Sequence, residues 1–210
     1  MKLIIMGAIG SGKGTQARFI SEKYGIAYIS TGDIMRRHIK EETPIGLKIK
    51  NVLASGGYVD DELTTELLKD RLTHDDCKAG FILDGYPRTI NQANIITSIA
   101  QIDKVLHLKV DNDTVIKRIS GRLTCRDCAE MYHIESKPPK QTKVCDVCGG
   151  ELYKRDDETE EAIKNRLAIF EKETIPTIEF FRDKGMLTEI EGVGDISQIT
   201  STIFKELDTI

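Results

Sequence analysis

A glycine-rich segment near the start of the chain has the composition of a phosphate-binding loop. Residues 7–15 read Gly-Ala-Ile-Gly-Ser-Gly-Lys-Gly-Thr and follow directly on the apolar run 3–6. Without a Cβ, glycine lets backbone N–H groups close around phosphate oxygens. Lys13 adds a mobile positive charge, and the helix-compatible run after it directs the positive end of its dipole at the same anion. The segment predicts a P-loop; a plain turn between a strand and a helix is the alternative.

One position of this loop departs from the generic pattern. Gly14 follows Lys13, so the hydroxyl expected near Mg²⁺ comes one residue late, at Thr15. The stretch that leads from this loop into the helix-compatible run comprises six consecutive residues: Gly10, Ser11, Gly12, Lys13, Gly14 and Thr15.

Four of the five cysteines form two pairs with the spacing of a metal site. Cys125 and Cys128 are followed, after a gap of sixteen residues, by Cys145 and Cys148. Two such pairs bring four thiolates to the corners of a tetrahedron, which is the geometry of a closed structural Zn²⁺ site. Because no coordination position stays open, this metal is predicted to support folding rather than catalysis. Four reduced cysteines without a metal, or a redox switch of paired thiols, are the alternatives.

Five short aliphatic runs supply a scaffold for these candidate sites. The runs are residues 2–6, 27–30, 81–84, 105–110 and 187–190. Helical patterns separate each run from the next, which predicts a parallel sheet with helices on both faces. Ligands bind beyond the carboxyl ends of such strands. Asp33 and Asp84 lie there, and Asp84 is placed to orient water around Mg²⁺.

A helical insertion follows the second run. Residues 31–59 contain two short helical patterns, and Thr43 has the position of an N-cap before Pro44 at the start of the second. A pair of glycines ends that helix, and Asp60 is placed to cap the next one.

Arginines flank the cysteine-rich segment on both sides. Arg118 and Arg122 lie four residues apart and would share one face of a helix, and Arg155 and Arg166 follow the last cysteine. Surface arginines usually pair with carboxylates, but phosphoryl transfer also uses guanidinium groups to neutralise charge on the migrating group. These side chains are candidates for either role.

Composition places the chain among globular proteins without a basic surface for nucleic acid. The 210 residues are 30% charged and 40% hydrophobic, and their formal net charge is −4. No run approaches the roughly 18 apolar residues of a membrane span. Cysteines in metal-type spacing suit a reducing compartment. We therefore expect a cytoplasmic protein with neither nucleic-acid nor membrane partners.

The motifs together resemble one family over essentially the whole chain: adenylate kinases, in the long form with a cysteine-rich lid. The matching segments are Gly7 to Thr15, Ser30-Thr-Gly-Asp33, Asp84-Gly-Tyr-Pro-Arg88, Gly121-Arg122, the two cysteine pairs and Arg155-x-Asp157. The resemblance implies an α/β fold of the P-loop NTPase type, a parallel five-stranded sheet flanked by helices, with a small helical monophosphate-binding insertion and a small zinc-ribbon-like β lid. The implied domains are a core of residues 1–29, 60–121 and 158–210, an AMP-binding domain of residues 30–59 and a lid of residues 122–157.

The resemblance also implies the residues of two nucleotide sites. ATP would contact the six loop residues named above together with Arg118, Arg122 and Gly194. AMP would contact Thr31, Arg36, Gly57, Val59, Gly85, Arg88, Gln92, Arg155 and Arg166. The catalytic residues would be Lys13, Asp84, Arg88, Arg122, Arg155 and Arg166. Asp33 and Asp84 would order waters on Mg²⁺, and Asp157 would steady arginines of the lid.

The activity implied by the resemblance is reversible, Mg²⁺-dependent phosphoryl transfer from ATP to AMP, giving two ADP, by a monomer with structural Zn²⁺ in its lid.

Three positions depart from the usual family pattern: Ile9 replaces a proline, Tyr86 a phenylalanine and Gly194 a frequent lysine. Two alternatives stay open. One is a kinase for UMP, CMP or GMP, and the other is a zinc-ribbon P-loop ATPase or switch that binds nucleic acid or a protein partner.

Overall fold

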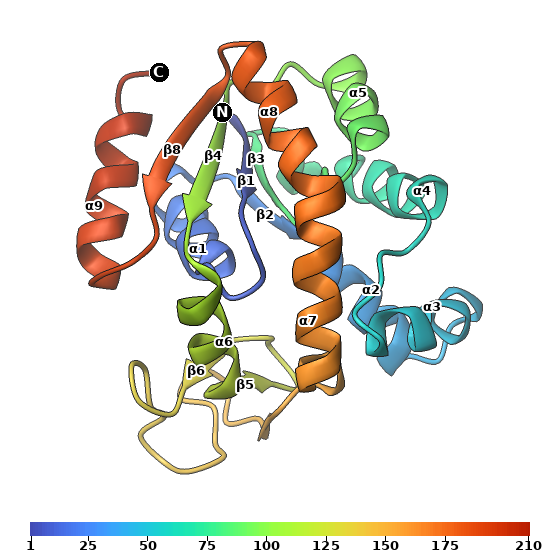
Figure 1. The fold of residues 1–210 in the computed structure, drawn as a ribbon, viewed down its shortest axis with the longest axis vertical. Helices are drawn as coiled ribbons and strands as arrows, with labels where there is room; N and C mark the ends of the chain where they lie inside the picture. The colour runs from blue at the N-terminus through green and yellow to red at the C-terminus, as the bar shows by residue number, and fades with distance from the viewer.

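The computed structural model describes all residues, 1–210, and has a five-stranded parallel sheet at its centre (Figure 1). The strand order is β2-β3-β1-β4-β8, and every neighbouring pair is parallel. The strands are β1 (Lys2–Met6), β2 (Ala27–Ser30), β3 (Phe81–Asp84), β4 (Lys104–Lys109) and β8 (Leu187–Glu191). The five aliphatic runs are therefore strands to within one residue at each end, and the predicted fold class is confirmed.

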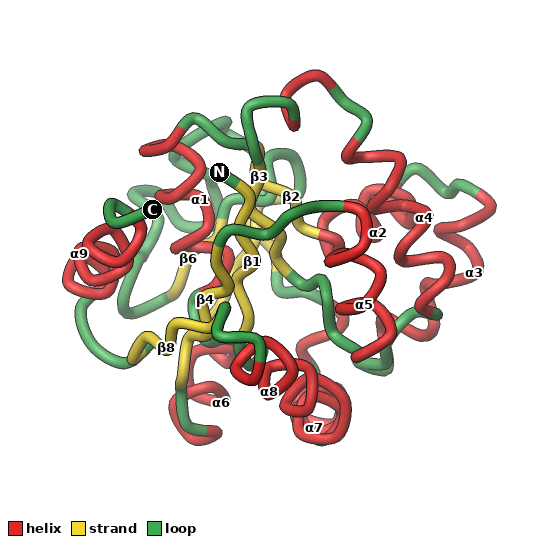
Figure 2. Tube along the Cα trace, turned by 90° about the horizontal axis from the view of Figure 1, so that it is seen from above, coloured by secondary structure: helices red, strands yellow, loops and turns green.

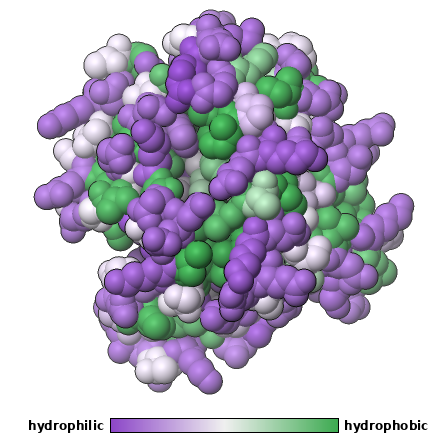
Figure 3. Space-filling view, in the orientation of Figure 1, coloured by the Kyte–Doolittle hydropathy of each residue, from purple (hydrophilic) through white to green (hydrophobic).

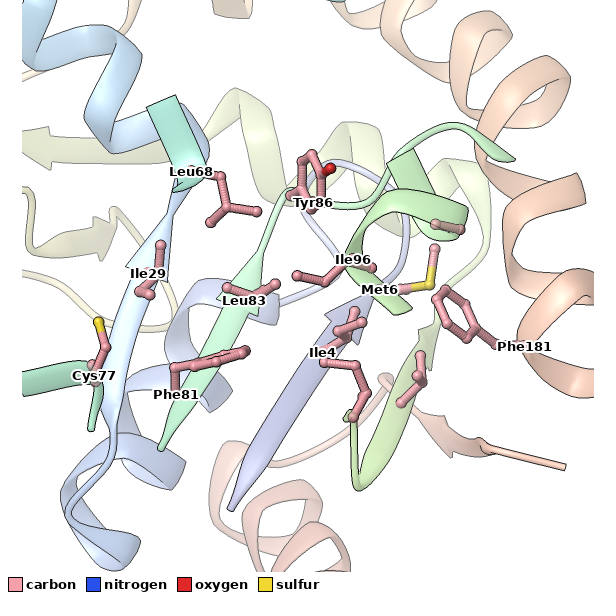
Figure 4. Packing of buried hydrophobic residues seen from close by; sticks show 14 of the residues in the cluster. Ile4, Met6, Ile29, Leu68, Cys77, Phe81, Leu83, Tyr86, Ile96 and Phe181 are labelled. Carbon is pink, nitrogen blue, oxygen red and sulfur yellow. The ribbon is translucent and has the colours of Figure 1, made fainter. Parts of the chain in front are cut away.

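Helices cover both faces of this sheet (Figure 2). On one face pack α1 (Lys13–Tyr24) and α9 (Ile196–Leu207), which meet Leu3 and Ile5 of β1. The other face takes α4 (Asp61–Leu72), α5 (Ile90–Ile99) and α8 (Ile175–Asp183). Because successive strand residues point to opposite faces, Ile4 and Met6 lie on this second side, against Phe181 and Ile96 (Figure 4).

The tyrosine that departs from the family pattern lies in this second layer. Tyr86 is 1% exposed, and its hydroxyl lies 3.0 Å from Thr65 Oγ1. A buried hydroxyl costs stability unless it has a hydrogen-bond partner. Thr65 of α4 supplies that partner, so a tyrosine can be buried at this position without an unpaired hydroxyl.

The helical insertion forms as its cap signals predict. It consists of α2 (Thr31–Lys40) and α3 (Pro44–Ala54). The Thr43 side chain accepts a hydrogen bond from Gly46 N at 3.1 Å, and Pro44 occupies the start of α3. Asp60 accepts from Glu62 N at 2.9 Å and so caps α4. Of the two insertion helices, α2 begins directly after β2 and contacts β3, and α3 packs against α2.

The cysteine-rich segment forms a second, three-stranded antiparallel sheet of order β6-β5-β7. Its strands are β5 (Arg122–Cys125), β6 (Met131–His133) and β7 (Leu152–Tyr153). This small sheet lies between α6 (Asn112–Ser120) and α7 (Glu160–Ile169), at the bottom of the view in Figure 1. The expectation that Arg118 and Arg122 share a helix face is wrong, because α6 ends before Gly121 and Arg122 opens β5.

Three short helical turns complete the chain: Asp75–Cys77, Asp156–Glu158 and the π-helical turn Phe170–Thr174 that joins α7 to α8. Hydrophilic side chains cover most of the face in Figure 3, and apolar groups gather along its middle. None of the helices combines the length and the hydrophobicity that a bilayer crossing requires.

Candidate functional site

The glycine-rich loop joins the end of β1 to the start of α1. Gly7, Gly10 and Gly12 have φ angles of 146°, 73° and 98°, in a region that other residues rarely adopt. The first N–H of α1 to find a helical partner is that of Gln16, which donates to Gly12 O at 3.0 Å. The N–H groups of residues 13–15 therefore remain free at the positive end of the helix, where an anion binds well.

Lys13 lies folded over this loop. Its Nζ donates to Gly7 O at 2.8 Å and to Ala8 O at 2.7 Å. Burial lowers the pKa of Lys13 to about 8; Asp84 opposes this shift, and the arginines nearby add to it. The ammonium group therefore lies in a crowded positive field, and an anion that enters the loop would stabilise its charged form.

A large cavity opens over the loop and runs toward the carboxyl end of β8. It is lined by all six predicted phosphate-binding residues and also by Arg118, Arg122 and Gly194. Arg118 crosses the far end, where it donates to Ser11 O at 3.3 Å and to Gly192 O at 2.8 Å. These bonds hold the guanidinium plane at the cavity wall, where a flat ring system could stack on it.

A second, smaller pocket lies between the helical insertion and the loop after β3. Eight of the nine residues expected to contact the acceptor nucleotide line it: Thr31, Arg36, Gly57, Val59, Gly85, Arg88, Gln92 and Arg166. The ninth, Arg155, lines the large cavity instead. Gln92 is fixed in this wall because its Oε1 accepts from Arg88 N at 2.8 Å and its Nε2 donates to Asp61 at 2.7 Å.

Carboxylates hold most of the arginines at the junction of the two cavities. Arg166 donates to Asp157 at 2.6 Å, Arg36 to Asp33 at 2.5 Å, and Arg122 pairs with Glu158. Arg155 Nη1 also lies 3.9 Å from Glu158. These pairs fix the directions of the guanidinium forks before any ligand arrives, and pre-organised donors are the main requirement for binding developing charge.

Positive charge exceeds negative charge at this junction. Its cations are Lys13, Arg36, Arg88, Arg122, Arg155 and Arg166, and its carboxylates are Asp33, Asp84, Asp157 and Glu158. Burial and the neighbouring arginines lower the pKa values of Arg155 and Arg166 to about 10. Burial alone would raise the pKa of Asp157, but the surrounding arginines outweigh it and hold that pKa below its usual value. The junction is built for an anion of several charges.

The four paired cysteines converge at the end of the small sheet. Their sulfur atoms all lie within 4.8 Å of one another, with 3.4 Å between Cys125 and Cys148 and 3.6 Å between Cys128 and Cys145. Zn–S bonds of about 2.3 Å would place thiolates about 3.8 Å apart in a tetrahedron, so the donor set fits Zn²⁺. Burial alone would raise the pKa of Cys145, but hydrogen bonds from Tyr132 and from backbone N–H groups lower it to about 6.

The small sheet contacts both the core and the helical insertion. Lys40 of α2 donates to Arg126 O at 3.1 Å, within the turn between the first two cysteines. Arg18 of α1 donates at 3.3 Å to the backbone oxygen of Ala129, the residue directly after Cys128. The small sheet is therefore tied to both, and its residues Met131 and His133 line one side of the large cavity.

Comparison with known proteins agrees with this geometry. A family profile described as "Adenylate kinase" matches residues 5–186. A protein of Syntrophotalea carbinolica named "Adenylate kinase" is 46% identical, with 99% of this chain and 98% of its own length aligned. The chain belongs to the adenylate kinase family. Proteins of the same name from Caldicellulosiruptor saccharolyticus (44% identical, 99% of each chain) and Geobacillus sp. strain WCH70 (46% identical, 97% of this chain and 96% of its own) agree.

The adenylate kinase resemblance drawn from the motifs is thus confirmed at the level of family, fold and enzyme class, a nucleoside monophosphate kinase. The individual roles of the site residues stay predictions. The structure brings every one of them to the two cavities or to the cysteine cluster, and Asp84 lies at the end of β3 in the wall of the large cavity.

Sequence reasoning gave no role to Glu158, a residue at the centre of the arginine junction. Its side chain is fully buried, it pairs with Arg122, and its Oε2 has no hydrogen-bond partner. An unpaired buried carboxylate oxygen is costly, which marks Glu158 as part of the site. The acidic run that directly follows Arg155 was the only signal in the sequence that could have pointed to it.

Proposed function

We propose that the chain catalyses reversible phosphoryl transfer from MgATP to AMP, giving two ADP. The observation that carries this proposal is that Arg36, Arg88 and Arg166 line both cavities. A nucleotide with its phosphates on the P-loop and a second nucleotide in the smaller pocket would direct their phosphates at the same three guanidinium groups. Such a junction suits transfer between two nucleotides better than hydrolysis of one.

The chemistry needs no catalytic base. The AMP phosphate is already anionic, so its oxygen can attack the γ-phosphorus of ATP directly, and the bond from that phosphorus to the β–γ bridging oxygen breaks. Lys13, Arg122 and Arg155 line the large cavity and would neutralise the donor and the migrating group. Arg36 and Arg88 also line the smaller pocket and would orient the acceptor. Catalysis is then positioning and charge neutralisation, with the lid keeping water from competing.

The residues of the large cavity also fit Mg²⁺. Asp84 has no arginine or lysine within salt-bridge distance, and its Oδ2 accepts a hydrogen bond from Tyr28 at 3.1 Å. Its charge is therefore available to waters of a hydrated cation, together with Asp33 and the Thr15 hydroxyl. When bound, magnesium neutralises and orients phosphate oxygens.

The domain boundaries expected from the sequence are proposed on the same basis: residues 30–59 close over AMP, residues 122–157 form the lid, and the rest is the core. In the lid we propose that Zn²⁺ on the four cysteines is structural.

The residues proposed for both nucleotide sites come from one chain, which supports a monomer. The acidic net charge and the reduced cysteines support a cytoplasmic enzyme without a nucleic-acid partner.

An acceptor panel tests the proposal against the related kinases. ADP formation is measured with ATP as donor and AMP, UMP, CMP or GMP as acceptor, each over the same concentration range. AMP should give the highest kcat/KM, by about tenfold or more. A higher value for any other monophosphate would assign the enzyme to that acceptor instead.

Lys13 should make ATP binding depend on pH above about 8. The lowered pKa means that the free protein loses this charge as pH rises through 8, whereas bound phosphates favour the ammonium form. ATP affinity should therefore fall by up to about tenfold per pH unit above 8, with proton uptake on binding.

The same lysine affects the stability of the free protein. Between pH 8 and 10.5 the unfolded chain binds more protons at Lys13 than the folded protein does, so the free energy of unfolding increases as pH rises in that window.

Calorimetric titration with ATP in two buffers of different ionisation enthalpy measures the proton uptake that accompanies ATP binding. Wild-type protein should take up almost no proton at pH 7 and about one at pH 9, and Lys13→Gln should take up none at either pH. Equal uptake in Lys13→Gln and wild type at pH 9 would show that another group is responsible.

A further inference from the structure

Tyr58 lies where the helical insertion rejoins the core, between the predicted AMP-binding residues Gly57 and Val59. Its ring lies under the Arg88 guanidinium, with 4.7 Å from Arg88 Cζ to the ring centroid. Its hydroxyl lies 2.9 Å from Thr174 Oγ1. Tyr58 therefore touches both the arginine at the junction of the cavities and the π-helical turn before α8.

The Tyr58 hydroxyl, the Thr174 hydroxyl and the backbone oxygen of Arg88 form a chain of hydrogen bonds. Thr174 Oγ1 donates to the backbone oxygen of Arg88 at 3.1 Å. A threonine hydroxyl has a single proton, so the proton between Tyr58 and Thr174 belongs to the tyrosine, which donates. The ring is thus fixed by its own hydroxyl to a group that also holds the backbone of Arg88.

Arg88 differs from the other arginines of the junction in what orients it. Arg36, Arg122, Arg155 and Arg166 each have a carboxylate within 4.0 Å, and Arg88 has none. Its Nε donates to Gly85 O at 2.8 Å. The aromatic face of Tyr58 is a second contact that restricts the direction of the guanidinium plane.

An aromatic ring suits this task better than a carboxylate would. A cation over a ring face is attracted by the ring quadrupole and keeps its N–H donors in the guanidinium plane free. A carboxylate would occupy those donors and repel a phosphate. The two terminal nitrogens of Arg88 are therefore available to an incoming anion while the plane stays fixed.

We propose that Tyr58 is a positioning residue for the acceptor phosphate, because its ring holds the Arg88 guanidinium in the orientation that binds that phosphate. The inference rests on the proposed function, in which Arg88 contacts AMP. It assigns to Tyr58 an effect on binding of the acceptor phosphate and none on binding of the adenosine part of the acceptor.

The test compares AMP with adenosine, which lacks the phosphate. Dissociation constants for both are measured by calorimetry for wild type, Tyr58→Leu and Tyr58→Phe. Tyr58→Leu should lower the preference for AMP over adenosine by about tenfold and raise KM for AMP by a larger factor than KM for ATP. Tyr58→Phe keeps the ring and should stay within about threefold of wild type.

Two further variants separate positioning from a general loss of structure. Tyr24→Leu removes a tyrosine at the end of α1 that also has a lysine over its ring, at 4.9 Å, and should leave the preference unchanged. In the Arg88→Ala background, Tyr58→Leu should cause no further loss, since the group that it positions is gone. If Tyr58→Leu fails to fold, Tyr58→Met fills the space without a ring and takes its place.

The outcomes separate this proposal from the function on which it rests. A wild-type protein that binds AMP no more tightly than adenosine would contradict the AMP site itself. Three results would overturn the role of Tyr58 alone. In the first, the preference for AMP persists in Tyr58→Leu. In the second, it falls equally in Tyr58→Phe, and in the third, it falls further when Tyr58→Leu is added to Arg88→Ala.

Discussion

Replacing Arg88 with alanine is expected to lower kcat/KM for AMP by about 10³, with the protein still folded. Loss of one pre-organised cationic donor at a migrating phosphoryl group typically costs 10²–10⁵ in rate. Arg88 has no carboxylate partner, so its removal leaves no buried negative charge behind. The melting temperature should therefore stay within about 4 °C of wild type, a change of about 1 kcal/mol in a chain of this size.

Arg88 gives a cleaner test than Arg122 for this reason. Arg122→Ala would leave the fully buried Glu158 without its main partner, and breaking a buried pair costs about 3–5 kcal/mol. Steady-state kinetics and thermal melts of Arg88→Ala are compared with Arg182→Ala, which removes an exposed arginine paired with Glu189 at 2.7 Å. Arg182→Ala should keep wild-type kinetics. A wild-type rate in Arg88→Ala would remove this arginine from the mechanism.

Loss of the metal from the cysteine cluster is expected to lower the melting temperature by about 10 °C. Without the metal nothing cross-links the four sulfur atoms, and burial raises the pKa of the Cys128 thiol to about 12, so that it takes up a proton. The small sheet that the cysteines hold has only four buried residues in its own core, and two of them are Cys125 and Cys145. A loss of about 3 kcal/mol converts to a shift of about 6–12 °C in a chain of 150–250 residues. Calorimetric scans before and after chelation measure the shift, and metal analysis gives the stoichiometry, expected to be one per chain.

A cysteine variant controls for side effects of the chelator. Cys145→Ser removes one of the two most buried ligands, so its scan should match that of the chelated wild type. Adding the chelator to Cys145→Ser should not lower its melting temperature further. A wild-type scan that chelation leaves unchanged, with zinc shown to be gone, would contradict a stabilising role for the metal.

Local signals in the sequence predicted the scaffold well. The strands, the capping of α3 by Thr43 and of α4 by Asp60, and the loop glycines all follow from residue type and short spacing. The exception is the pair Arg118 and Arg122, where a four-residue spacing indicated one helix. Gly121 ends α6 and a strand begins directly after it, so the helical period stops between the two arginines.

The contacts that orient the site could not be read from local patterns. Tyr58 has ordinary neighbours in the sequence, and Glu158 has only the acidic run in which it lies. Their roles depend on Arg88 and Arg122, which lie 30 and 36 residues away along the chain. Only the tertiary fold brings the turn Asp156–Glu158 beside the start of β5, and the end of the insertion beside the loop after β3. Motifs named the groups that would touch a nucleotide, whereas the groups that hold them required the fold.

The central claim is that AMP, and not water, accepts the phosphoryl group. The most direct measurement is ADP formation from MgATP with and without AMP, followed together with free phosphate. We predict two ADP for each ATP consumed when AMP is present, with no free phosphate, and negligible turnover when AMP is absent. Release of phosphate from ATP at the same rate without AMP would contradict the account and would favour a P-loop ATPase.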